Sequence, residues 1–219
     1  MTAAIQMRTL ATGIPQKIDT AKGRELITGI CKETIEEVLL SVDGFSGDDV
    51  ADKKHHGGPD RAVCIYPHEH YALWNNEFEC VLPSAAFGEN ITVSGMTESE
   101  VCIGDVFTLG DAVIQVTQGR IPCSTIDQRL GLPVMKHMIQ TGFTGYLCRV
   151  LKEGLVRSDD RIALHTRDPL GVTVLEANTT YFHNPKDVEG IQRVLAIEAL
   201  ADDWRDKFGK RLETAVATN

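Results

Sequence analysis

The sequence predicts a mixed, mainly β fold that ends in a small helical domain. Across residues 1–170, short segments with alternating apolar and polar residues are separated by turns that contain glycine. A junction with proline and glycine lies at residues 167–171, and beyond it apolar residues recur at three- and four-residue intervals. Closely spaced strands with little helix between them are typical of a barrel or a sandwich-like sheet. We therefore expect a β-barrel domain in residues 1–170 and a three-helix domain in residues 171–219.

The strands expected in the first domain are short. The segment Leu109-Gly110-Asp111-Ala112 has the composition of a tight hairpin turn between two of them. Two helical interruptions are expected, one beginning near Pro67, because proline suits the first helical turn, and one at residues 133–140. The strands themselves are expected at residues 35–41, 62–66, 90–93, 105–109, 112–117, 145–151 and 161–165.

Three helices are expected after the junction, at residues 172–182, 185–201 and 202–212. Asn184-Pro185 is a good start signal, because asparagine caps a helix and proline fits its first position. The apolar residues of the last two helices form stripes that must pack on one another or on the barrel, namely Ile191, Val194, Leu195, Trp204, Phe208 and Leu212.

The composition is that of an ordinary globular protein, and it argues against nucleic acid and membranes as partners. Of the 219 residues, 42% are hydrophobic and 24% are charged, and the formal net charge is −9. Nucleic acid is not an expected partner, because the chain is acidic and its helical tail mixes acids with bases. We expect no membrane partner and a cytoplasmic location, since the sequence has neither a long apolar run nor the apolar core of a secretory signal.

Cys123 stands apart from the other cysteines because of the loop that carries it, Gln118-Gly119-Arg120-Ile121-Pro122-Cys123. Pro122 stiffens this loop, and Arg120 would favour the thiolate form of Cys123 if the two side chains meet. A thiolate on a rigid loop suits a nucleophile or a ligand for a soft metal, and a buried structural cysteine is the plain alternative. The others lack zinc-site spacing and are expected to be ordinary thiols: Cys31, Cys64, Cys80, Cys102 and Cys148.

A second candidate lies at residues 51–63, where basic side chains surround the turn Gly57-Gly58-Pro59. Paired glycines let backbone amides approach an anion closely, and the flanking cations, which are two lysines, two histidines and an arginine, would hold a phosphate. The segment is neither a Walker loop nor a dinucleotide fingerprint. A solvated basic turn is the alternative interpretation.

Two further polar runs carry weaker signals. Gly88-Glu89-Asn90 leads into an expected strand, where it would either orient a cofactor ring or only make a turn. His68-Glu69-His70 lacks the four-residue spacing that places two histidines on one face of a zinc-binding helix. We expect both histidines at the surface, without a metal.

Taken together, residues 52–62, 86–90 and 118–123 resemble the MOSC domains, a family named after the C-terminal part of molybdenum cofactor sulfurases, and in particular its YiiM-like branch. That resemblance implies a MOSC-type β-barrel followed by a three-helix domain, and a bound molybdenum cofactor. It makes Cys123 the thiolate that binds molybdenum and Arg120 the cation that neutralises cofactor charge. The other positions that match the family's cofactor-binding segments are Lys54, His56, Gly57, Gly58, Arg61, Gly88, Glu89 and Asn90.

The leading hypothesis is therefore a reductase that converts N-hydroxylated compounds, such as N-hydroxylated purine bases, to the corresponding amines. The chain has no flavin, nicotinamide, haem or iron–sulfur motif, and pyridoxal phosphate is not expected, so a separate reductase would donate the electrons. A hypothesis from another class is a sulfur carrier or a molybdenum cofactor carrier, in which Cys123 holds a persulfide.

Overall fold

The structure, a computed structural model, describes residues 5–20, 23–53 and 57–217. Its main feature is an eight-stranded sheet with the order β13-β9-β10-β11-β7-β8-β1-β4. Neighbouring strands are antiparallel, except for β7 and β8, which run parallel. The eight strands are β1 (Gln6–Thr12), β4 (Glu33–Thr34), β7 (Val63–Pro67), β8 (Ile91–Ser94), β9 (Val106–Leu109), β10 (Ala112–Gly119), β11 (Tyr146–Lys152) and β13 (Ile162–Thr166).

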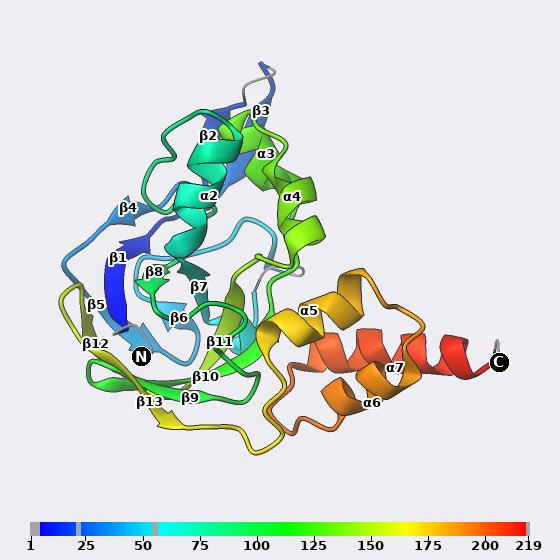
Figure 1. The fold of residues 1–219 in the computed structure, drawn as a ribbon. Coiled ribbons are helices and arrows are strands. Elements are labelled where there is room, and N and C mark those ends of the chain that lie inside the picture. Colours follow the sequence, from blue (N-terminus) through cyan, green and yellow to red (C-terminus); the bar gives the residue numbers. More distant parts are fainter. Residues whose placement is uncertain (1–4, 21–22, 54–56, 218–219) are drawn as a thin grey trace.

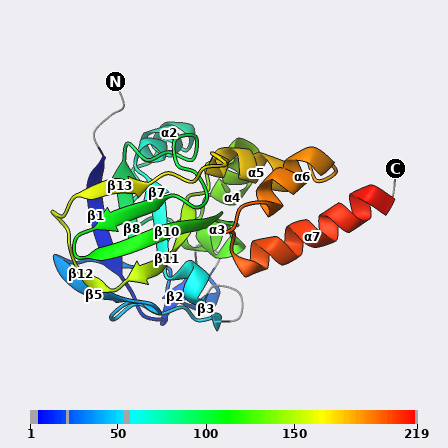
Figure 2. The same ribbon diagram turned by 90° about the horizontal axis from the view of Figure 1, so that it is seen from below.

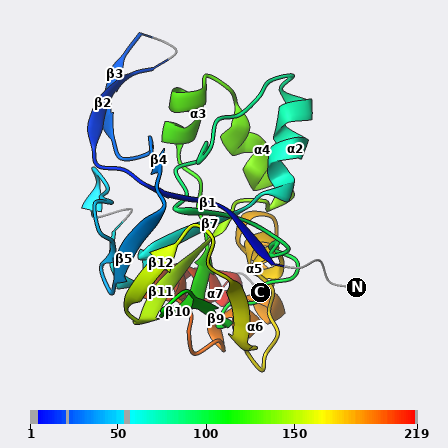
Figure 3. The same cartoon turned by 90° about the vertical axis from the view of Figure 1, so that its left-hand side faces the viewer.

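Two smaller sheets complete the β structure. One contains β12 (Gly154–Arg157), β5 (Glu37–Ser41) and β6 (Gly44–Phe45), and it lies beside the main sheet, so that strands surround a shared apolar core (Figure 1). The other is a hairpin of β2 (Gln16–Asp19) and β3 (Glu25–Thr28), which projects from the body (Figure 3). The predicted fold, mainly β and barrel-like, is confirmed.

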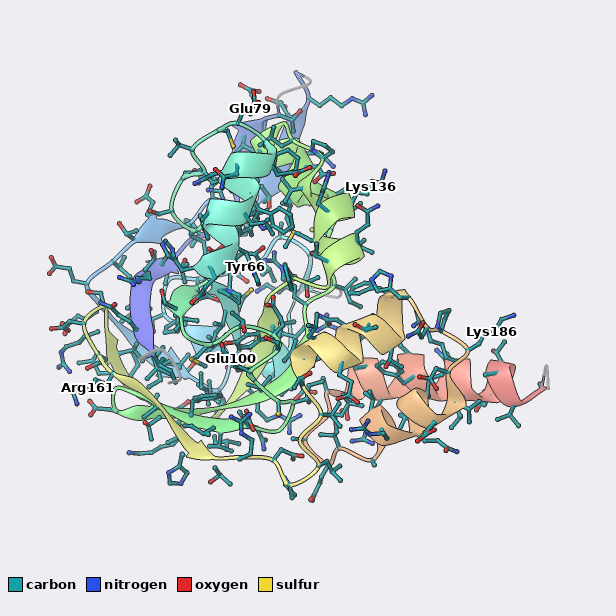
Figure 4. All side chains as sticks on the ribbon, in the orientation of Figure 1. Tyr66, Glu79, Glu100, Lys136, Arg161 and Lys186 are labelled. Carbon is teal, nitrogen blue, oxygen red and sulfur yellow. The ribbon has the colours of Figure 1, made fainter. Side chains whose placement is uncertain are left out.

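Three short helices cover one end of the barrel: α2 (Glu69–Glu77), α3 (Ser124–Leu130) and α4 (Val134–Thr141) (Figure 1). They share an apolar cluster with the end of β7. Tyr66 lies at the base of α2 (Figure 4), where its hydroxyl accepts a hydrogen bond from Trp74 Nε1 at 2.7 Å and donates one to the Phe143 carbonyl at 3.2 Å.

The C-terminal helices α5 (Val174–Phe182), α6 (Val188–Leu195) and α7 (Asp202–Ala217) form a separate group beside the barrel, and α7 extends away from it (Figure 2). Trp204 is fully buried in this group and stacks on Tyr181, with ring centroids 5.4 Å apart. The predicted three-helix C-terminus is thus confirmed. Within the described residues, no helix is long and apolar enough to cross a membrane.

The predicted bounds of the middle C-terminal helix are wrong. The helix α6 begins at Val188 rather than at Pro185, because the Asp187 carboxylate accepts the Gly190 N–H at 3.1 Å and so acts as its cap. It also ends at Leu195, six residues before the predicted end. The Arg205 guanidinium donates hydrogen bonds to the Leu195 and Ile197 carbonyls at 2.9 and 2.8 Å. These carbonyls would have accepted backbone N–H groups in a longer helix.

Other differences are local. The helix expected from Pro67 begins at Glu69, since Pro67 is the last residue of β7. His70 is buried rather than exposed: its ring bonds to the buried Glu98 carboxylate at 2.6 Å. The helix α3 was not expected, because its seven residues are too short to show a clear period. The predicted hairpin is confirmed, with Leu109 paired to Ala112 and Gly110 at φ 55°.

Candidate functional site

The loop that carries Cys123 joins the end of β10 to the start of α3. Arg120 N–H donates to the Gly145 carbonyl at 2.9 Å, which continues the β10–β11 pairing past Gly119. Cys123 is the residue before the helix and has an extended backbone, with φ −115° and ψ 160°. Its side chain is half-buried. Both anchors of this loop are regular elements, so the position of the thiol is fixed by the sheet and by α3.

Arg120 connects this loop to a second loop at residues 85–90. Its Nη2 donates to the Phe87 carbonyl at 2.7 Å, whereas its Nη1 is buried and has no hydrogen-bond partner among the described residues. Burial opposes the charged guanidinium, but attraction to Cys64, Cys123 and Glu89 outweighs it, and the pKa of Arg120 is raised. A buried, charged donor group with an unused N–H is suited to hold an anion.

The loop at residues 85–90 is built around the Glu89 carboxylate, which is fully buried. Oε1 accepts hydrogen bonds from the Tyr71 hydroxyl and from the Thr92 hydroxyl, the latter at 3.0 Å, and Oε2 accepts the Phe87 N–H at 3.1 Å. Because one of these bonds holds the Phe87 N–H, Glu89 supports the residue whose carbonyl accepts from Arg120. The structure therefore places Glu89 behind the site as a support.

Asn90 has a similar supporting position. Its Oδ1 accepts the Cys64 N–H at 3.0 Å, and its Nδ2 donates to Asp48 Oδ2 at 2.9 Å and to the Ala11 carbonyl at 3.3 Å. The amide thus joins β7, the end of β1 and the segment around Asp48. Through these three contacts Asn90 holds the segments beside the site together.

Lys32, Asp48 and Cys64 were not singled out from the sequence, yet they lie in the same region. The Lys32 ammonium pairs with the Asp48 carboxylate, and their side chains are only 5% and 13% exposed. Burial raises the pKa of the Cys64 thiol, while Arg120 and Lys32 act to lower it. A lysine in a short loop gives no periodic signal, so only the fold reveals that Lys32 is here.

The helix α3 is fastened to the same walls. Arg129 Nη1 donates to the carbonyls of Ile30, Ala85 and Ala86 at 2.7, 2.7 and 3.0 Å. One side chain therefore binds the segment before Lys32, the loop at residues 85–90 and the helix that follows Cys123. This arginine, which the sequence analysis did not single out, holds the elements of the site together.

The glycine pair lies on a different part of the wall. Gly57 N–H donates to the Lys53 carbonyl at 3.2 Å, and Gly58 has φ 107° before the short 3₁₀ helix η1 (Pro59–Arg61). Arg61 contacts α7, with its Nη2 2.6 Å from Asp203 Oδ2. Lys54 and His56 lie outside the described residues. The structure thus brings Arg120, Cys123 and the loop at residues 85–90 together, and it directs Arg61 to the C-terminal helices.

Gly88 has a conformation that only glycine adopts easily, with φ 78°. A Cβ at this position would lie 2.6 Å from Ile30 Cγ1. We expect Gly88→Ala to lower the free energy of unfolding by about 1–3 kcal/mol, because it adds both backbone strain and a collision. Urea unfolding would measure this loss. Gly171→Ala is the control, since Gly171 also has a positive φ but no atom lies within 4 Å of its Cβ position; an equal loss in both variants would show that strain alone matters at Gly88.

The donor set of the site argues against a bare metal ion. Among the residues that the structure describes, no group of three or more histidine, cysteine or carboxylate side chains is placed to hold one. A metal bound through Cys123 would therefore need other ligands brought by a cofactor. The unused N–H of the buried Arg120 guanidinium fits a cofactor that is anionic.

Comparison with known families identifies the family of this chain. The MOSC domain matches residues 52–163, and the YiiM-like 3-alpha helix domain matches residues 172–215. The chain belongs to the MOSC family, in its YiiM-like branch. The segments at residues 52–62, 86–90 and 118–123, from which the resemblance was inferred, all fall inside the first match.

Three similar proteins illustrate the relationship. The uncharacterized protein YflK of Bacillus subtilis is 43% identical over 205 residues, which cover 93% of this chain and 92% of YflK. The crystal structure of YiiM from Geobacillus stearothermophilus has a TM-score of 0.80 and 30% identity, and the match covers 95% of this chain and 99% of that one. A protein named reductase from Gibberella moniliformis is 37% identical over 153 residues, which cover 67% of this chain but 27% of that protein.

Proposed function

We propose that this protein binds a molybdenum cofactor and reduces N-hydroxylated compounds, such as N-hydroxylated purine bases, to the corresponding amines. The observation that carries the proposal is that the Cys123 loop also holds Arg120, a buried cation near Cys123 with an Nη1 that has no hydrogen-bond partner among the described residues. Membership of the MOSC family supports a protein related to the molybdenum cofactor. We also propose a cytoplasmic location, in keeping with six cysteines that are all thiols.

The residues of this chain would hold the cofactor by complementary charge and by one soft ligand. A molybdenum–pterin cofactor is anionic through its phosphate and its dithiolene, and the Arg120 guanidinium would neutralise part of that charge. The Cys123 thiolate would bind the molybdenum, since a soft sulfur ligand suits a metal already bound by sulfur. Glu89 and Arg129 would act one step away, by holding the Phe87 carbonyl and the loop walls in place.

The bound cofactor would supply a two-electron reduction of the N–O bond, which also takes up two protons and yields an amine and water. We propose that the electrons come from a separate reductase. The Gibberella relative named reductase supports this arrangement, because the match covers only 27% of that protein and most of its length lies outside the part that resembles this chain.

Metal analysis and an activity assay on freshly isolated protein test the proposal. We expect molybdenum in nearly stoichiometric amount, and we expect loss of hydroxylaminopurine when a chemical reductant replaces the unknown electron donor. An Arg120→Gln variant should lose most of the molybdenum, because it keeps much of the side-chain volume but not the charge. Stoichiometric molybdenum without any turnover of the substrate would refute the reductase activity and leave the cofactor site.

A carrier role is the second candidate, because Cys123 is a thiol on a loop that also holds a buried cation. On this proposal Cys123 would hold sulfane sulfur or would pass cofactor on without turnover. Alkylation followed by mass spectrometry would find an added sulfur atom on Cys123. Its absence in protein isolated without reductant would exclude the persulfide form.

A further inference from the structure

Asp60, next to the glycine pair, joins the barrel to the last helix. Its Oδ1 accepts hydrogen bonds from Arg149 Nε at 2.9 Å and pairs with Arg149 Nη2 at 2.7 Å. Its Oδ2 accepts the Asp202 N–H at 3.1 Å. The Asp60 carbonyl also accepts the Thr117 hydroxyl at 2.7 Å. One residue of the turn therefore contacts β11, β10 and the first residue of α7.

The contact with Asp202 has the role of a helix cap. The first N–H groups of a helix have no partner within the helix, and a side-chain oxygen just before it normally accepts one. The residue before α7 is Ala201, whose methyl group has no oxygen to offer. The carboxylate of Asp60, 142 positions away in the sequence, takes that role and adds a negative charge at the end of the helix where it is favourable.

Arg61 makes the second half of the connection. Its Nη2 lies 2.6 Å from Asp203 Oδ2, and its side chain is only 13% exposed. Asp203 also pairs with Lys207 one turn later, at 2.6 Å. Asp60 and Arg61 thus bind successive residues in the first turn of α7, and we call these two contacts the α7 latch.

The same helical group also contacts the Cys123 loop. A Cβ on Gly119 would collide with Asn178 Oδ1 of α5 and would lie 3.0 Å from Trp204 of α7. The Ala201 N–H donates to the Thr117 carbonyl at 3.1 Å. The helical group therefore contacts both segments that the proposed function uses, the glycine turn and the Cys123 loop. It does so at Asp60, Arg61 and Gly119, and not at Cys123 itself.

We propose that the three-helix group positions the cofactor site, and that the α7 latch is the device that holds the Gly57-Gly58-Pro59 turn. The turn itself has two short-range backbone bonds among the described residues, Gly57 N–H to Lys53 and Arg61 N–H to Gly58. Beyond these two bonds, the turn is held through the residues that follow it: Asp60 contacts the barrel and α7, and Arg61 contacts α7. The inference rests on the proposed function only in taking this turn to serve the cofactor.

Asp203→Asn tests the latch, with Glu176→Gln as a matched control. Glu176 is also a first-turn acid, is also 36% exposed, and also pairs with an arginine at 2.6 Å, but its partner Arg193 belongs to the helical group itself. Lys207→Gln is a second control, because it removes the other partner of Asp203. Hydrogen exchange at the amides of residues 57–62 measures the turn directly, and the unfolding midpoint shows whether the whole fold is affected.

We expect exchange in the turn to be about fivefold faster in the Asp203→Asn variant and unchanged in both controls, with similar unfolding midpoints. Equal exchange in the Asp203→Asn and Glu176→Gln variants would overturn the latch. Molybdenum retention during dialysis should fall only in the Asp203→Asn variant. Full retention of molybdenum in the Asp203→Asn variant despite faster exchange would overturn the positioning role. Wild-type protein without molybdenum would refute the proposed function, and the exchange comparison would then still test the latch.

Discussion

Cys123→Ser should remove the molybdenum and the reductase activity while leaving the fold intact. A serine hydroxyl is about the size of the thiol but is a hard and weakly acidic group, so it cannot replace a soft thiolate ligand. We expect activity to fall by more than about 100-fold, in line with the loss of a metal ligand. The unfolding midpoint should change little, because Cys123 is only half-buried. Metal content and turnover with a chemical reductant would be measured on the same preparation.

Two other cysteines make this experiment discriminating. Cys80→Ser changes a half-buried thiol in the apolar cluster around α2 and should keep both metal and activity. Cys64→Ala is the stricter comparison, because Cys64 also lies within the influence of Arg120. We expect it to retain most of the activity. If Cys64 proved as necessary as Cys123, the choice of metal ligand would be wrong.

Glu89→Gln should destabilise the protein and disturb the site together. The carboxylate is fully buried and accepts three hydrogen bonds, from Tyr71, Thr92 and the Phe87 N–H, and an amide nitrogen in place of one oxygen opposes a donor. We expect a loss of about 2–4 kcal/mol in the free energy of unfolding. Because the Phe87 carbonyl accepts a hydrogen bond from Arg120, molybdenum retention should fall as well.

Glu98→Gln is the matched control for this second prediction. Glu98 is equally buried and accepts the Gly145 N–H at 2.7 Å while bonding to His70, but it makes no bond to the loop at residues 85–90 in the described part of the chain. Through Gly145 it reaches only the backbone N–H of Arg120, whereas Glu89 supports the residue whose carbonyl accepts from the Arg120 guanidinium. Replacing Glu98 should cost comparable stability and lower metal retention less than Glu89→Gln does. Urea unfolding and metal analysis of both variants would separate the two effects. A Glu89→Gln variant that is as stable as the wild type would contradict the role given to this carboxylate.

Local patterns in the sequence predicted many of the elements, but they missed the strands β1, β2, β3 and β12 and the helix α3. Alternating apolar residues predicted β10 and β11 within one or two residues, because each side of a strand faces a different environment and the pattern is short-range. The bounds of α6 were missed for a physical reason. Two cap signals compete there, Asn184-Pro185 and Asp187, and only the Asp187 carboxylate accepts an N–H of the helix. We retain 1–170 and 171–219 as proposed domain bounds.

The sequence by itself determined the mainly β fold with its helical tail, and it drew attention to the Cys123 loop, because turn chemistry and a Pro-Cys pair are visible within a few residues. Only the tertiary structure decided what surrounds that loop. Lys32 comes from a distant segment, Arg129 of α3 reaches carbonyls of two distant segments, and Arg61 contacts Asp203 of α7. The role of a charged side chain depends on the group that it contacts. Groups more than a hundred residues apart, such as Arg61 and Asp203, meet only when the sheet and the helices have packed.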